Sequence, residues 1–209
     1  MEEKEILQIF SKPSTDLKFL KKKFNFNDKN EYPNDITLQL HKLNYLGDFM
    51  SNYQMANVGE MYYFKLSGKL RYTDSGAFDS IVTNLLKNHK CKNVIVDLNL
   101  TTYMDSTNLG ILARLAGGIF AYSHDKISII SKNVDIISLL ENCGFEQICN
   151  IISTYNDPQL ENLSLKEMDD QKREKSSMMY ESHKYLAEMN KENKLKFKDV
   201  VEILKKSIK

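Results

Sequence analysis

Residues 94–110 read Val94-Ile-Val-Asp-Leu-Asn-Leu-Thr-Thr-Tyr-Met-Asp-Ser-Thr-Asn-Leu-Gly110, and they contain the pattern that decides the fold. The first seven residues are apolar enough for a strand that is covered on both faces, as interior strands of mixed α/β sheets are. A short loop is expected at residues 101–105. From Leu109 to Phe120, apolar residues then recur at steps of three and four, which predicts a helix whose first turn contains Ser106.

The segments on both sides continue this alternation of strands and helices. Tyr62, Phe64 and Leu66 fall on one face at period two, as in a strand. Further strands are predicted at residues 126–131 and 148–152, and helices from about 75 to 89 and over 134–140, the last closed by Gly144. The sequence therefore predicts an α/β fold, a small mixed β-sheet backed by helices.

The two flanks of this central part differ from it. Residues 1–53 are expected to form a mostly helical extension, with short helices at Glu2–Phe10 and Thr15–Phe24. Residues 35–53 favour a third helix, although residues 36–40 also alternate as a strand would. At the other end, residues 158–209 predict a hairpin of two amphipathic helices, at Ser176–Asn190 and Lys194–Ile208.

The mixed-charge run at residues 166–175 separates this hairpin from the last predicted strand and is too polar to be buried without many partners. We therefore expect every strand to lie before residue 157, and the hairpin to be an interaction element outside the central core. The apolar stripe of its second helix needs a cover. A homodimer formed through the hairpin is one of the options.

Composition limits the classes of partner. Lysine and arginine (29) balance aspartate and glutamate (28), so no broad basic surface for direct nucleic-acid binding is expected. No apolar run approaches the ~20 residues that span a bilayer, and the chain begins with acidic residues. These features predict a cytoplasmic protein without membrane insertion. Cys91, Cys143 and Cys149 have neither zinc-ligand nor disulfide spacing and are expected to be buried thiols.

The junction Asp105-Ser106-Thr107 is the most informative candidate site. Polar residues at a helix start commonly cap the helix, and this is the simplest interpretation of the spacing. The alternative is a regulatory hydroxyl at Ser106, because a phosphate there would add about −1.5 to −2 charge units beside Asp105. No catalytic constellation, cofactor motif or metal-ligand set is visible, so the sequence predicts a protein that is not an enzyme. Gly117 and Gly118 are expected to permit close helix packing.

Three segments resemble the STAS domain, and within that family the bacterial anti-sigma-factor antagonists. They are Leu66-Ser-Gly-Lys-Leu70, the strand Val94–Leu100, and Met104-Asp-Ser-Thr-Asn-Leu-Gly110. The third is the most specific, because the family reads Asp-Ser-Ser/Thr-Gly-Leu-Gly at this junction. The serine that follows the aspartate, which an ATP-using partner kinase phosphorylates in the family, corresponds to Ser106, with Thr107 as its neighbour. Asn108 stands where the family usually has glycine.

The resemblance implies a STAS domain at residues 54–157 and a phosphorylation-switched role in bacterial signal transduction and transcription regulation. The chain would act by partner switching. Unphosphorylated at Ser106, it would dock on an ATP-binding anti-sigma factor or serine kinase of the switch type, and a metal-dependent serine phosphatase would reset the phosphoprotein. The docking residues implied are Asp105, Ser106, Thr107, Asn108, Leu109 and Gly110.

Two other functions stay open. The first is a non-catalytic STAS subunit of a larger assembly, such as a lipid-transport ATPase complex, in which the same surface docks permanently. The second, a small-molecule or nucleotide sensor, is less favoured because the sequence has no phosphate-binding glycine loop.

Overall fold

The computed structural model describes residues 51–88, 91, 93–153, 160, 162–168 and 174–208. All of them belong to one compact unit, Asn44–Lys209, which is separate from a unit at Met1–Leu43. The helices predicted at Glu2–Phe10 and Thr15–Phe24, and most of the one predicted at 35–53, lie outside the described residues.

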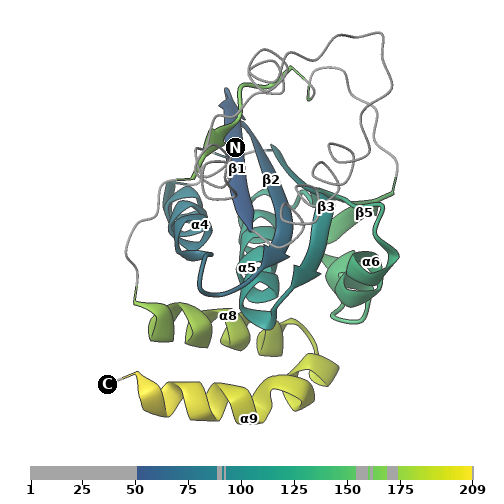
Figure 1. The fold of residues 1–209 in the computed structure, drawn as a ribbon. Helices are drawn as coiled ribbons and strands as arrows, with labels where there is room; N and C mark the ends of the chain where they lie inside the picture. Colours follow the sequence, from purple (N-terminus) through teal and green to yellow (C-terminus); the bar gives the residue numbers. More distant parts are fainter. Residues whose placement is uncertain are drawn as a thin grey trace, which may run out of the picture. The chain divides into compact units, whose positions relative to one another are not determined.

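A six-stranded mixed sheet forms the centre of the described unit, with the strand order β5-β4-β3-β2-β1-β6 (Figure 1). β2 to β5 run parallel to one another, whereas β1 is antiparallel to both β2 and β6. The strands are β1 (Asn52–Val58), β2 (Met61–Leu70), β3 (Asn93–Met104), β4 (Ile127–Ile130), β5 (Cys149–Ile152) and β6 (Lys166–Glu167). The predicted fold class is confirmed.

Five α-helices accompany the sheet in the described part of the chain. They are α4 (Gly76–Asn88), α5 (Ser106–Ser123), α6 (Val134–Glu141), α8 (Lys175–Met189) and α9 (Lys191–Ser207). Every strand and helix predicted between residues 61 and 152 is present. Gly144 has the left-handed φ of +79° expected of a glycine that closes a helix.

Three expectations about the sheet are wrong. Residues 101–104 continue β3 instead of forming a loop, because β2 runs on to Leu70 and pairs with them as far as Met104. The predicted helix ending at Tyr53 gives way to β1 from Asn52 onwards. β6 lies beyond residue 157, where no strand was expected, because it adds to the free edge of β1.

β1 was not predicted, although the glycine in the turn that follows it is typical of a β-hairpin. Val58 pairs with Met61, so only Gly59 and Glu60 lie in the turn between β1 and β2. Gly59 has a φ of +62°. A two-residue hairpin turn of the favoured types needs positive φ, which glycine adopts at no steric cost.

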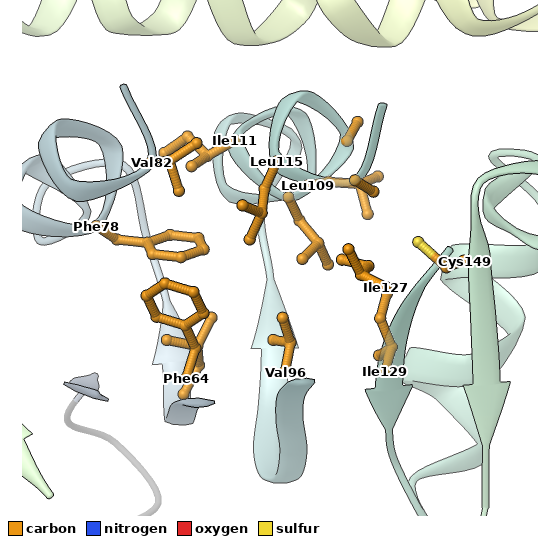
Figure 2. Packing of buried hydrophobic residues seen from close by; sticks show 14 of the residues in the cluster. Phe64, Phe78, Val82, Val96, Leu109, Ile111, Leu115, Ile127, Ile129 and Cys149 are labelled. Carbon is orange, nitrogen blue, oxygen red and sulfur yellow. The ribbon is translucent and has the colours of Figure 1, made fainter. Parts of the chain in front are cut away.

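The main hydrophobic core lies between one face of the sheet and helices α4 and α5 (Figure 2). Phe64 and Phe78 meet edge to face at 5.7 Å between ring centroids, and Val96 faces the apolar stripe of α5. A Cβ atom at Gly118 would lie 2.5 Å from the Leu86 side chain, which confirms close packing of α5 on α4 at this glycine. The three cysteines are free and buried, as predicted.

The C-terminal helices form a hairpin, but α8 is part of the core. Met178 and Leu186 are 1% and 0% exposed and belong to the same buried cluster as Phe64. α8 lies on α5 and α9 lies on α8 (Figure 1). The expectation of a hairpin outside the core is therefore wrong. The physical reason is Gly110 in α5, which has no side chain and lets the α8 backbone approach closely at Ser182.

Candidate functional site

The candidate site lies where β3 ends and α5 begins. Asp105 is the N-cap residue of α5, with an extended backbone, and its Oδ1 accepts a hydrogen bond of 2.9 Å from the backbone N–H of Asn108. Its Oδ2 accepts one of 2.6 Å from the backbone N–H of Tyr72, in the loop that leads to α4. Both carboxylate oxygens thus bond backbone donors and fix the helix start to a neighbouring loop.

Since Asp105 caps the helix, the hydroxyl of Ser106 is available for another partner. Ser106 Oγ lies 2.8 Å from Nε2 of His183, which comes from α8. The other ring nitrogen of His183, Nδ1, lies 2.7 Å from the backbone carbonyl oxygen of Met179. A carbonyl can only accept, so Nδ1 carries the proton, and in the neutral imidazole Nε2 accepts from the Ser106 hydroxyl.

Asn108, the departure from the family pattern, ties the helix start to β1. Its Nδ2 donates to Asp105 Oδ1 at 3.1 Å, and its Oδ1 accepts from the Tyr53 hydroxyl at 2.9 Å. Burial, and then the negative charges of Asp105 and Asp74, raise the pKa of Tyr53, so the hydroxyl remains a donor at neutral pH. Asn108 itself is 1% exposed, so this network is shielded from water.

A buried ion pair continues the site along α5. Arg114 pairs with Asp79 of α4, and its Nη1 lies 3.2 Å from Oε2 of Glu181 of α8. One guanidinium therefore connects three helices. Removing either carboxylate would leave a mostly buried charge with fewer partners, which is costly in a site of low exposure.

The structure places the six predicted docking residues at different depths. Asp105 and Ser106 are half-buried, whereas Thr107, Asn108, Leu109 and Gly110 are buried. Leu109 points into the main core between α5 and the sheet (Figure 2). Only Asp105 and Ser106 of the six therefore retain some exposed surface, while the other four set the geometry of the helix start.

Sequence reasoning missed two kinds of residue near this site. His183 and Tyr53 contact it from elements that are distant in the chain, and no local pattern points to them. Large exposed apolar side chains also lie in the second half of β3 (Leu100 and Tyr103), in the loop after β2 (Tyr72) and at the first residue of α6 (Val134). Their exposed fractions are between 41% and 71%, which is high for side chains of this type.

Among the described residues, no cluster of three or more histidine, cysteine, aspartate or glutamate side chains could hold a metal ion. Within the same ranges, no helix is both long and apolar enough to cross a membrane.

Two of the comparisons with known proteins found similar proteins. The family model of the STAS domain matches residues 52–157. Similar solved structures include the Bacillus cell fate determinant SpoIIAA in its phosphorylated form, at 11% identity and a TM-score of 0.45, covering 52% of this chain and 96% of that one. The anti-sigma factor antagonist SpoIIAA in its unphosphorylated form matches at 12% identity and 0.44, covering 52% and 94%. The protein TM1081 matches at 18% and 0.41, covering 48% and 79%. No curated protein matches.

Proposed function

Because the chain belongs to the STAS domain family, we propose that it is a regulatory binding protein that docks on a partner protein through the surface around Ser106. The partner class implied by the resemblance at Met104–Gly110 is an ATP-binding anti-sigma factor or serine kinase. One observation carries the proposal: Asp105 caps α5, which leaves the hydroxyl of the half-buried Ser106 free of the capping role.

Phosphorylation at Ser106 would alter this surface strongly. The γ-phosphoryl group of ATP would pass to Ser106 Oγ with ADP as the leaving group, and the partner kinase would supply the catalysis and accept the hydroxyl proton. The phosphoserine would carry about −1.5 to −2 charges next to the Asp105 carboxylate and could no longer donate to His183. A change of about 1.4 kcal/mol in docking free energy alters the dissociation constant tenfold, so such a modification suffices as a switch.

The exposed apolar residues around the site favour a protein as the docking partner. Tyr72 and Tyr103 are 41% and 48% exposed, and Leu100 and Val134 are more exposed still. Aromatic side chains are enriched at protein interfaces because they combine a large apolar area with a polar tip. These residues would supply the contact area, and phosphorylation of Ser106 would control whether the partner docks.

One observation favours the second candidate, a STAS subunit that docks permanently in a larger assembly such as a lipid-transport ATPase complex. Ser106 is half-buried and already hydrogen-bonded to His183, as expected of a hydroxyl with a structural role. In that case no phosphate would cycle on Ser106, and a negative charge there would leave the assembly intact or disrupt the fold.

A pull-down from the source cells, with captured proteins identified by mass spectrometry, tests the proposal. The wild-type chain, Ser106→Ala and Ser106→Glu are compared, with Ser207→Glu as a matched control that adds a negative charge at the exposed end of α9. We expect Ser106→Glu to capture at least about tenfold less partner than the other three chains. Equal capture by all four would refute the switch, and equal capture of membrane ATPase subunits would establish the second candidate.

A further inference from the structure

We propose that α8 is an internal cover of the docking site: it occupies the face of α5 that begins at Ser106, and a partner protein gains access to that face only when α8 has moved away. This inference rests on the proposed function, because it names the regulation of the same surface. It concerns the closed arrangement seen in the structure and an open arrangement in which the central domain stays folded.

The contacts between α5 and α8 lie on one face of α5. Ser106, Gly110, Arg114 and Gly117 follow one another at steps of four, four and three, so they share a helix face. Each of them meets α8, at His183, Ser182, Glu181 and Tyr185 respectively. The hydroxyl of Ser106 therefore belongs to the same continuous surface of α5 on which α8 packs.

Two of these four positions in α5 are glycines, which brings the helices close together. A Cβ atom at Gly110 would lie 2.6 Å from Cβ of Ser182, closer than such atoms approach in proteins. At Gly117 the nearest atom to such a Cβ would be Cε1 of Tyr185, at the ordinary contact distance of 3.8 Å. A folded partner that follows this face of α5 from Ser106 would therefore collide with α8.

The buried side of α8 is only half apolar. Its buried residues are Met178, Ser182, His183 and Leu186, and the Ser182 hydroxyl, in a residue 1% exposed, has no hydrogen-bond partner. A buried polar group without a partner has lost its water without compensation, which weakens the contact. Met178 and Leu186 therefore hold α8 in place, while the unpaired hydroxyl of Ser182 lowers the free energy that its release requires.

The turn between α8 and α9 provides an anchor that survives such a release. The side-chain amides of Asn190 and Asn193 donate to the carbonyl oxygen of Cys143, at 3.3 and 2.9 Å, and Lys196 Nζ donates to the carbonyl of Asn142 at 3.1 Å. This end of the hairpin is held to the loop after α6 independently of α5 (Figure 1). α8 can thus swing from α5 without the hairpin leaving the domain.

A thiol at position 106 tests the cover without any knowledge of the partner. The variant Ser106→Cys is treated with 5,5′-dithiobis(2-nitrobenzoate), whose reaction rate reports how often the thiol becomes accessible. The three native cysteines are buried and are followed separately in the unsubstituted chain. We expect the folded variant to react at least about tenfold more slowly than the same chain in guanidinium chloride.

Three double variants are then compared, each with one further substitution added to Ser106→Cys. Two of these substitutions are expected to release α8, and the third is a control. Gly110→Ala places a methyl group against Ser182, and Glu181→Arg sets a second cation against Arg114, so each should raise the labelling rate about tenfold or more. Gly117→Ala adds the same methyl group on the same helix face where there is room, and it should leave the rate unchanged. All chains should retain a cooperative melt and protected amides in α5.

Three results would overturn the inference. The first is labelling of folded Ser106→Cys as fast as in the unfolded chain. The second is an unchanged rate in both Gly110→Ala and Glu181→Arg; if Gly110→Ala fails to fold, Glu181→Arg alone decides. The third is that the thiol of the Ser106→Cys chain reacts only when the whole chain unfolds. Failure of the Ser106→Glu pull-down would refute the proposed function and leave these labelling results, and hence the covering of Ser106 by α8, intact.

Discussion

Replacement of Ser106 by alanine tests the hydrogen bond on which the closed arrangement depends. The hydroxyl donates over 2.8 Å to Nε2 of His183, and the ring is held in place by Met179, whose carbonyl oxygen is 2.7 Å from Nδ1. His183 is only 7% exposed, so water has little access to the acceptor that the substitution leaves behind. The loss is therefore that of a buried polar group without a partner, not merely of one hydrogen bond.

The expected magnitude follows from this geometry. A hydrogen bond that water can replace contributes about 0.5–1.5 kcal/mol to the free energy of unfolding, whereas a buried acceptor left without a donor costs about 1–3 kcal/mol. We expect Ser106→Ala to lower the free energy of unfolding by about 1–3 kcal/mol. In a domain of 150–250 residues each kcal/mol shifts Tm by about 2–4 °C, so the expected fall in Tm is roughly 2–12 °C.

Urea denaturation followed by far-UV circular dichroism measures the change, with Ser123→Ala as the matched control. Ser123 lies at the other end of α5 and is also half-buried, but its hydroxyl donates within the same helix, to the carbonyl oxygen of Ile119 at 2.9 Å. The hydroxyl also accepts from the backbone N–H of Asp125 at 3.0 Å, and this donor is exposed, so water can replace the serine there. The carbonyl of Ile119 can accept other donors, so the control should cost less than about 0.5 kcal/mol. Equal losses in Ser106→Ala and Ser123→Ala, or no loss in either, would refute the stabilising role of the contact between Ser106 and His183.

Three further predictions concern stability. Leu186→Ala, at a fully buried site of α8, should lower the free energy of unfolding by about 2–5 kcal/mol in urea denaturation. As a control, replacement of Leu195 by alanine in α9, where Leu195 is 79% exposed, should change this free energy by less than about 0.5 kcal/mol. Small effects of both substitutions would show that α8 is not packed in the core. Tyr53→Phe should cost about 1–3 kcal/mol because Asn108 Oδ1 loses its donor, and an unchanged denaturation midpoint would contradict the buried network. Burial raises the pKa of the Cys91 thiol from 9.0 to about 11. As the pH rises, the unfolded chain loses this proton before the folded chain does, so the free energy of unfolding should fall between pH 9 and pH 11. Cys91→Ala should make this fall shallower, and an unchanged slope would count against the raised pKa.

The alternation of elements over residues 61–152 was predictable because periodicity is a local property. Apolar residues at steps of three and four place a stripe on one side of α5, and this stripe needs a cover whatever the rest of the chain does. The junction at Asp105 and Ser106 was predictable for the same reason, since a polar pair between a buried strand and an amphipathic helix marks a helix start. The assignment of the capping role to Asp105, and not to Ser106, required the structure.

The partners of Ser106 were decided by tertiary structure alone. His183 is 77 residues away in the chain, and as a lone histidine in a polar helix it has no spacing that relates it to α5. Ser182 and His183 are polar and yet buried, because Gly110 lacks the side chain that would keep α8 away from α5. The short strand β6 depended in the same way on the free edge of β1. Local sequence determines which face of an element must be covered; the element that covers it depends on how two distant surfaces fit, and this is settled only when the chain has folded.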